Sequence, residues 1–233
     1  MTDPSLAQIL EACTQRCREM DAPLGDRLSA FADDVRRLSP DFAEIVDGMV
    51  NRLAQAGAGA SAPSPGETMP SFVLPDENGR LVSLGELLQK GPVVVSFLRG
   101  HWCPYCRISA DALSRIDPEI KAAGGHIVVI TPEVQKYTRT LKRDAQAEFP
   151  ILTDLDSGYA LELGLAIRID DDKRHAMTLS GWDISAFQDS DNWTLPIPAT
   201  FVVGIDRIVK AKFVDPDYRK RMAIENILSA LRR

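Results

Sequence analysis

The feature that most constrains this chain is a pair of cysteines placed between a strand and a helix. The apolar run 93–98 is predicted to be a buried strand, and Cys103-Pro104-Tyr105-Cys106 follows it at the start of a predicted helix. At the first turn of a helix, unpaired backbone N–H groups and the positive end of the dipole would stabilise a thiolate on Cys103. Proline at the next position costs no hydrogen bond. Cys106 lies one turn further along, so the motif predicts a dithiol–disulfide centre.

Two other interpretations of the pair are inert core thiols and a metal or iron–sulfur site. A metal site needs further ligands, and the sequence has no second Cys-x-x-Cys and no histidine pair at zinc spacing. We therefore predict a site without metal or cofactor, while a cluster shared between two subunits stays open as an alternative. Cys13 and Cys17 lie four residues apart on the apolar stripe of a predicted helix, and we expect them to pack in the core.

Length and charge narrow the classes of protein that fit. With 233 residues and 45% hydrophobic content, the chain can bury one sizeable core and a small appendage. The net charge of -6 disfavours nucleic acid or an anionic membrane as a partner. No stretch resembles a signal peptide or a membrane span, and four cysteines are too few for a secreted disulfide scaffold. We therefore expect a cytoplasmic protein that binds neither nucleic acid nor membrane.

Residues 1–56 are predicted to form a helical segment. Their apolar residues recur at helical spacing in three stretches, at 6–20, 24–38 and 42–53. Residues 57–70 form a linker rich in glycine, alanine, serine and proline, with little that could pack. Three short amphipathic helices cannot bury their apolar stripes alone. They must pack on the rest of the chain or on a second copy, and we predict a homodimer formed by this segment or by the insert described next.

Predicted strands and helices alternate over residues 71–233, which indicates an α/β fold with a mixed central sheet flanked by helices. An insert at about 165–196 breaks the pattern. It carries two of the three tryptophans and the acidic run Asp170-Asp171-Asp172, which we interpret as a solvated loop rather than a cation site. The expected architecture is one α/β domain with a helical N-terminal extension.

A second feature lies far from the cysteines, where Pro198 stands at the head of a predicted core strand. A proline there removes a ladder hydrogen bond, so it is usually placed where another group approaches. The stretch Pro198-Ala199-Thr200-Phe201 resembles the loop of thioredoxin-like oxidoreductases in which a cis-proline faces the cysteine pair. The resemblance implies that Ile197, Pro198 and Thr200 form a substrate platform, with the backbone of Ile197 offered to an extended substrate.

Three stretches, at 70–76, 79–84 and 91–97, carry a closer resemblance. Over residues 67–233 the chain resembles the alkyl hydroperoxide reductase/thiol-specific antioxidant (peroxiredoxin) family. It is similar to a bacterial branch of that family with a Trp-Cys-Pro-Tyr-Cys motif. The resemblance implies a thioredoxin-like fold, an antioxidant role, and side chains that tune the cysteines, namely Arg99, Trp102, Pro104 and Tyr105.

Three positions depart from the usual pattern of that family. Where the family typically has a threonine or serine, this chain has Gly100. Where the family typically has a proline it has Ser96, and where the family typically has an arginine it has Pro198. Arg99 and Arg168 are the candidates to replace that arginine. The departures disfavour fast peroxide reduction. They leave thiol–disulfide exchange intact, because exchange needs only an accessible thiolate, a second thiol and a substrate platform.

The sequence therefore predicts a thiol-dependent oxidoreductase. Cys103, with its pKa lowered by the helix terminus and by Arg99 or Arg107, is expected to attack a peroxide or a disulfide substrate. Cys106 then resolves the product to an internal disulfide, and a cellular dithiol or glutathione reduces it. Two alternatives stay open: a dedicated thiol–disulfide oxidoreductase without peroxidase activity, and a redox-sensing interaction protein in which the disulfide changes how the N-terminal helices dock.

Overall fold

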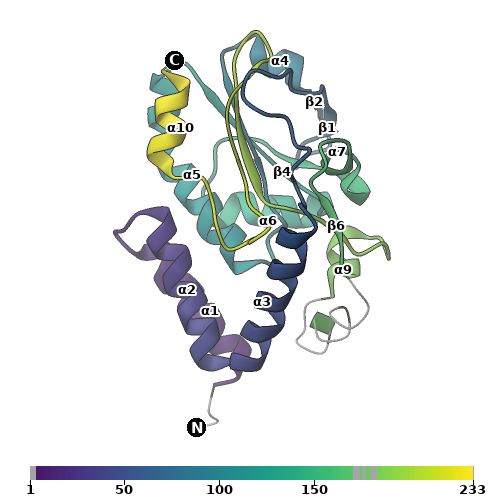
Figure 1. The fold of residues 1–233 in the computed structure, drawn as a ribbon. Helices are drawn as coiled ribbons and strands as arrows, with labels where there is room; N and C mark the ends of the chain where they lie inside the picture. Colours follow the sequence, from purple (N-terminus) through teal and green to yellow (C-terminus); the bar gives the residue numbers. More distant parts are fainter. Residues whose placement is uncertain (1–3, 170–173, 175–176, 179–182, 233) are drawn as a thin grey trace.

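A mixed sheet organises the part of the chain that the computed structural model describes, which is residues 4–169, 174, 177–178 and 183–232. Within these residues, five strands pair in the order β5-β4-β3-β8-β9 (Figure 1). β3, β4 and β5 are parallel, and β8 is antiparallel to both β3 and β9. The predicted α/β fold class is confirmed by these strands, β3 (Val93–Phe97), β4 (His126–Thr131), β5 (Ile151–Thr153), β8 (Ala199–Val203) and β9 (Val209–Val214).

The central strand β3 is buried on both faces of the sheet. Successive side chains of a strand point to opposite faces. Accordingly, Val94 packs in one hydrophobic cluster, while Val95 and Phe97 pack in the other. A continuous apolar run is typical of a strand covered on both sides, so the buried strand predicted ahead of the cysteines is confirmed.

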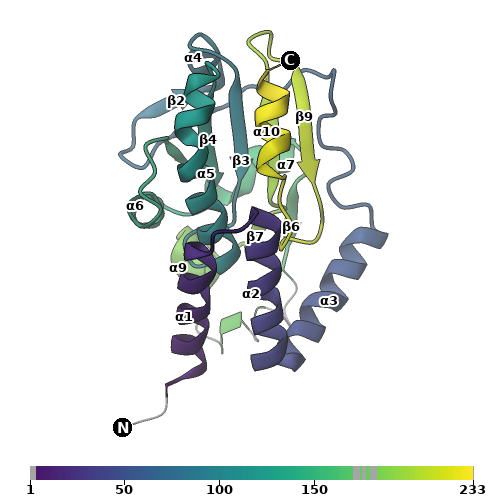
Figure 2. The same cartoon turned by 90° about the vertical axis from the view of Figure 1, so that its left-hand side faces the viewer.

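Helices cover both faces of the sheet (Figures 1 and 2). On one face lie α5 (Pro104–Ala122) and α10 (Ile224–Leu231), and on the other lie α4 (Leu84–Leu88) and α7 (Gly158–Glu162). α6 (Gln135–Asp144) connects β4 to β5 and contacts α5. The smaller described elements are the hairpin β1 (Val73–Pro75) and β2 (Leu81–Ser83), the ribbon β6 (Ala166–Arg168) and β7 (Thr194–Pro196), the 3-10 turn η1 (Leu155–Ser157) and α9 (Ile184–Gln188).

Three amphipathic helices precede the sheet, as the apolar spacing predicted: α1 (Leu6–Glu19), α2 (Leu24–Leu38) and α3 (Pro40–Gln55). Figures 1 and 2 show them beyond the end of the sheet at which α5 begins. α1 and α2 pack on α5, and the buried Cys17, Leu28 and Phe31 join the same hydrophobic cluster as α5. Part of the apolar surface of these helices is therefore covered by the rest of the same chain, while Leu6 and Ile45 stay exposed. The homodimer stays a prediction.

The linker between α3 and β1 is more tightly packed than its composition suggested. Gly59 and Ala62 are buried, and a Cβ at Gly59 would lie 2.6 Å from Val214 Cγ1. Lys212 Nζ donates a hydrogen bond to the Ala62 carbonyl oxygen at 2.7 Å. The expectation that this linker has little that could pack is wrong at these positions, because small residues let its backbone approach β9 closely.

The predicted insert contributes β6, α9 and β7 among its described residues. The acidic run Asp170-Asp171-Asp172, interpreted as a solvated loop, lies outside the described residues. Of the helices that the structure describes, none has both the length and the apolar character needed to cross a bilayer.

Candidate active site

The two cysteines lie where a short loop joins β3 to α5. Cys103 is the N-cap residue of α5 and Pro104 is the first helical residue. Both thiols are free and buried, with Cys103 2% exposed and Cys106 fully covered. The backbone N–H of Cys106 donates to the Cys103 carbonyl oxygen at 3.0 Å, which places the second cysteine one turn above the first. The predicted placement of the pair at a strand-to-helix junction is confirmed.

Cys106 is the more acidic thiol of the pair. Burial alone would raise its pKa, but a hydrogen bond from the Cys103 thiol, the charge of Arg221 and the N–H groups of Arg99 and Gly100 lower the pKa to about 6. The Arg99 N–H donates to Cys106 Sγ at 3.2 Å, and Arg221 Nη2 donates to the same atom at 3.7 Å. At neutral pH the Cys106 sulfur is therefore mostly a thiolate.

Cys103 keeps its proton in this reduced state. Burial raises the pKa of its thiol well above the usual value, and the hydrogen bond to the Cys106 sulfur raises it further. The predicted low pKa of Cys103 is wrong here, because the N–H groups of Cys106 and Arg107 already donate to the Cys103 carbonyl and Pro104 has no N–H. The two sulfurs share one proton, so the first ionisation belongs to the pair.

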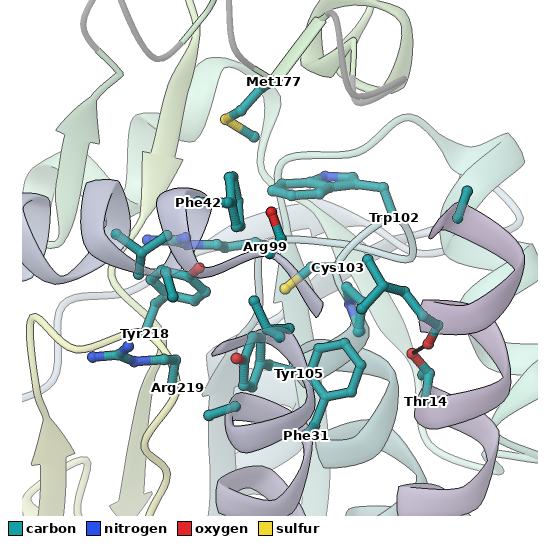
Figure 3. A pocket seen from close by; sticks show the side chains of 18 of the residues that line it. Thr14, Phe31, Phe42, Arg99, Trp102, Cys103, Tyr105, Met177, Tyr218 and Arg219 are labelled. Atoms are coloured by element: carbon teal, nitrogen blue, oxygen red, sulfur yellow. Dashed lines mark hydrogen bonds between the residues drawn. The ribbon is translucent and has the colours of Figure 1, made fainter. Parts of the chain in front are cut away.

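A cavity of about 620 Å³ opens above Cys103 (Figure 3). Cys103 lines it, together with Trp102, Pro104 and Tyr105 of the same motif, whereas Cys106 does not. Tyr105 packs edge-to-face on two rings, with centroid distances of 5.0 Å to Phe31 and 5.5 Å to Tyr218. The structure therefore brings three of the predicted tuning residues to the cysteine that an external molecule can reach.

Arg99 lines this cavity together with Arg107 and Arg219 (Figure 3). Its side chain is buried, and the guanidinium carbon lies 3.9 Å from the ring centroid of Tyr218. Its Nε and Nη2 have no hydrogen-bond acceptor among the described residues. Arg168 is exposed on β6 and does not line the cavity. Of the two candidate replacements for the family arginine, Arg99 alone has a suitable position.

Arg107, the other cation expected to act on Cys103, is engaged elsewhere. Its two terminal nitrogens donate to both carboxylate oxygens of Glu11 in α1, each at 2.6 Å. This bidentate ion pair ties α1 to the second turn of α5. Arg107 therefore holds the N-terminal helices over the site and is not aimed at the cysteine.

The three predicted platform residues do not reach the cavity. The described residues contain no cis peptide bond, so the Ile197–Pro198 bond is trans and the expected cis-proline is wrong. Ile197 is fully buried, and its N–H donates to the Leu165 carbonyl oxygen at 2.7 Å. Thr200 is buried in β8, opposite Ser96 of β3. Because the β6–β7 ribbon occupies the backbone of Ile197, that backbone cannot donate to an extended substrate.

Glu133 is a buried residue of the site that sequence reasoning missed. Its Oε2 accepts the His101 N–H at 2.7 Å, while burial above all raises the pKa of its carboxyl to about 8. Gly100 lies against it with φ +137°, and a Cβ there would overlap the Glu133 carboxyl group. This contact explains why position 100 cannot hold the family's threonine. No local sequence pattern marks Glu133, since it follows β4 like any loop residue.

Tyr218 and Arg221 are the other missed residues, and both precede α10. Tyr218 stacks on Arg99, and Arg221 contacts Cys106 from 115 residues away in sequence. The family resemblance over residues 67–233 included Tyr218 but gave it no role. Among the described residues, no three histidine, cysteine, aspartate or glutamate side chains are grouped so as to hold a metal ion.

Residues 65–212 match the model of the AhpC/TSA family, and the match spans more than half of the chain. The chain belongs to the AhpC/TSA family. Among solved structures, this AhpC/TSA protein resembles peroxidoxin BcpB from Mycobacterium tuberculosis with a TM-score of 0.57 and 21% identity, over 73% of this chain and 97% of that chain. The likeness confirms the thioredoxin-like fold that the sequence resemblance implied.

Curated relatives of this AhpC/TSA protein include two kinds of redox protein. It is 30% identical over 100 residues to thiol-disulfide oxidoreductase ResA of Bacillus subtilis (strain 168), covering 42% of this chain and 55% of ResA. It is 31% identical over 100 residues to chloroplastic peroxiredoxin Q of Sedum lineare, covering 43% of this chain and 53% of that protein. The chain spans about half the length of these curated relatives.

Proposed function

We propose that this AhpC/TSA protein is a cysteine-based oxidoreductase that reduces peroxides through Cys103 and Cys106. The observation that carries the proposal is the asymmetry of the pair. Cys103 lines a cavity that Arg99 also lines, and Cys106 lies behind it with the negative charge. One sulfur is thus positioned to meet a small oxidant and the other to resolve the product.

The first step starts from the shared proton. Transfer of the proton from Cys103 to the Cys106 thiolate turns Cys103 into the nucleophile as the oxidant approaches. Its sulfur attacks the nearer peroxide oxygen, the S–O bond forms and the O–O bond breaks, giving a sulfenic acid on Cys103. The leaving alkoxide or hydroxide takes the proton back from Cys106 and departs as alcohol or water. We assign the stabilisation of the charge on that leaving oxygen to Arg99, which lines the same cavity as Cys103.

The second step uses the thiolate that this proton transfer regenerates on Cys106. It attacks the Cys103 sulfur, the S–S bond forms, and hydroxide leaves and is protonated by solvent. The protein has then lost two electrons, which an external dithiol or two molecules of glutathione return. The reductant, the cytoplasmic location that suits it, and the homodimer are parts of the proposal that rest on the sequence.

A dedicated thiol–disulfide oxidoreductase is the second candidate, and the residue at position 100 favours it. Gly100 has no hydroxyl, and its contact with Glu133 leaves no room for one. The similarity to thiol-disulfide oxidoreductase ResA points the same way. In that reaction Cys103 attacks a substrate disulfide and Cys106 displaces the reduced product from the mixed disulfide.

Stopped-flow fluorescence distinguishes these functions. Trp102 lies next to Cys103, and we expect its emission to change when the pair is oxidised. Reduced protein is mixed with hydrogen peroxide, with an alkyl hydroperoxide and with a small disulfide, and the Cys103→Ser variant serves as the control. We expect the wild type to react with peroxides at rate constants far above that of a free thiol, and we expect Cys103→Ser to lose this reaction. If peroxides react no faster than with a free thiol while the disulfide reacts fast, the protein is a dedicated thiol–disulfide oxidoreductase and the peroxidase proposal is wrong.

A further inference from the structure

The loop between β3 and α5 directs its N–H groups at two acids. The N–H of Arg99 donates to Cys106 Sγ at 3.2 Å, and the N–H of Gly100 donates to the same sulfur. The next two N–H groups, of residues 101–102, donate to the carboxyl group of Glu133, the first of them to Oε2 at 2.7 Å. Neighbouring N–H groups of one short loop therefore bind the thiol and the carboxyl group, and each acid lies in the electrostatic field of the other.

Glu133 is a buried acid with no role in the two steps above. Its side chain is fully buried, and its Oε1 has no hydrogen-bond partner among the described residues. Burial is the main cause that raises the pKa of this carboxyl to about 8, and the charge of Cys106 raises it further. In the reduced protein at neutral pH, Cys106 therefore carries the negative charge and Glu133 carries a proton.

Oxidation of the pair changes the charge of one group in this neighbourhood. The titratable and charged groups on the described elements around Glu133 are Arg99 and His101 of the loop, Cys106 of α5, Lys136 and Asp144 of α6, Asp154 after β5, Asp183 and Asp189 at the ends of α9, and Arg221 before α10. The ring of His101 pairs with Asp144 at 2.8 Å. When a disulfide forms, Cys106 loses its charge, and the repulsion that it exerts on an ionised Glu133 disappears.

The two arginines beside the pair make the loss of that charge costly. Arg99 is buried in the field of both cysteine sulfurs, and Arg221 Nη2 donates to Cys106 Sγ at 3.7 Å. A disulfide is neutral, so it removes the anion that these cations face in the reduced protein, and a buried charge without a counter-charge is unfavourable. Glu133 shares the loop with that anion and already accepts two N–H bonds. An ionised Glu133 is therefore placed to replace the lost charge.

We propose that Glu133 stores a proton for the redox cycle, holding it while Cys106 is a thiolate and releasing it when Cys103 and Cys106 form a disulfide. This inference rests on the dithiol–disulfide cycle of the proposed function. In that cycle the thiol and the thiolate give up two electrons and one proton, and the peroxide takes them and leaves as an alcohol and a hydroxide ion. The proton that Glu133 releases converts the hydroxide to water. The cysteine pair and the carboxyl group then carry one negative charge between them before and after the reaction.

NMR of isotopically labelled carboxyl carbons measures the ionisation of Glu133 in each redox state. The full-length protein is labelled at glutamate and aspartate, and through-bond correlation assigns the resonance of Glu133, so the assay needs no variant of that residue. The reduced protein is compared with the disulfide form made with diamide, a thiol oxidant that bypasses peroxide. We expect Glu133 to titrate at least about one pH unit lower in the disulfide form, which is about a tenfold change in its acid dissociation constant.

Asp154 is the internal control. It is also a buried carboxyl whose pKa is raised above all by burial, but the N–H groups of Tyr159 and Ala160 hold it, away from the loop at the cysteines. Its titration is expected to be the same in both redox forms. Equal titration of Glu133 in the two forms, or an equal shift of Asp154, would overturn the proposal.

Cys106→Ser separates the charge from the disulfide. The variant has a neutral hydroxyl in place of the thiolate, so Glu133 is expected to titrate at least about one pH unit lower than in the reduced wild type. If it titrates as in the reduced wild type, the proposal is wrong, because the charge of Cys106 then does not control the carboxyl. If diamide fails to join Cys103 to Cys106, the proposed function fails at its redox pair, and the Cys106→Ser titration still decides whether that charge controls the proton on Glu133.

Discussion

Replacing Arg221 with glutamine is predicted to raise the pKa of Cys106. Arg221 Nη2 lies 3.7 Å from Cys106 Sγ, and two unit charges about 4 Å apart attract by about 4 kcal/mol at an effective dielectric constant near 20. Arg221 is partly exposed, so solvent screening leaves about 2 kcal/mol. At about 1.4 kcal/mol for each unit, the pKa rises by about 1.5 units. At pH 7 the thiolate fraction of the pair then falls from about nine tenths to about one quarter.

The ultraviolet absorbance of the thiolate, followed as a function of pH, measures this shift. Burial raises the pKa of both Cys13 and Cys17 above the usual thiol value, so the ionisation near pH 6 belongs to the active-site pair. The rate of Cys103 alkylation against pH gives a second reading of the same ionisation.

Lys220→Gln is the matched control for Arg221→Gln. Lys220 is the neighbouring residue, and its ammonium pairs with Asp215 at 3.1 Å instead of contacting the cysteines. Its replacement removes the same charge and is expected to leave the pKa of Cys106 near 6. An unchanged ionisation in a folded Arg221→Gln protein, or an equal rise in both variants, would refute the view that this contact sets the acidity of the pair.

Three further predictions concern stability. Gly100→Ala forces a Cβ into the Glu133 carboxyl group at a positive φ, and denaturant titration is expected to show a loss of at least about 2 kcal/mol. The pKa of the Glu133 carboxyl is raised to about 8 from an ordinary value of 4.5, so this group makes the wild type less stable as the pH rises from about 4.5 through 8. Glu133→Gln lacks this ionisation. Thermal melts at several pH values are expected to show its unfolding free energy rising by a few kcal/mol relative to that of the wild type over the same interval. Phe31→Ala removes a ring buried against Tyr105 and is expected to cost about 3–5 kcal/mol of unfolding free energy.

Each of these stability predictions has a result that contradicts it. A Gly100→Ala protein as stable as the wild type would show that Glu133 can move aside. A stability difference between Glu133→Gln and the wild type that stays constant with pH would mean that the carboxyl is not held neutral by burial. A small effect of Phe31→Ala would indicate that α2 is only loosely held against α5.

Local sequence patterns predicted most of the elements around the site. Each of these patterns is confined to a short stretch of sequence. They are the apolar run that forms β3, the Cys-x-x-Cys at the start of α5, and the helical spacing of apolar residues in α1, α2 and α3. The same locality explains the failure at the linker, where composition predicted no packing but Gly59 and Ala62 are buried. Whether a small residue packs depends on what faces it, and β9 faces this linker.

The acidity of the two thiols depends on which N–H groups are free, and a sequence does not show this. The helix terminus points its N–H groups at the Cys103 carbonyl, while the loop N–H of Arg99 donates to Cys106. Arg221 and Glu133 reach the motif only through the fold. The platform expectation failed for a related reason, because the Ile197 N–H donates to the Leu165 carbonyl oxygen, a partner that is distant in the sequence.

The most direct test of the central assignment is to locate the sulfenic acid by mass spectrometry after one equivalent of peroxide, with a sulfenic-acid trapping reagent present. The account predicts that Cys106→Ser accumulates the trapped group on Cys103. It also predicts that Cys103→Ser accumulates none on Cys106, although Cys106 is the more acidic thiol, because only Cys103 lines the cavity. If Cys103→Ser forms a trapped sulfenic acid on Cys106 as fast as Cys106→Ser forms one on Cys103, the account is contradicted and the roles of the two cysteines are reversed.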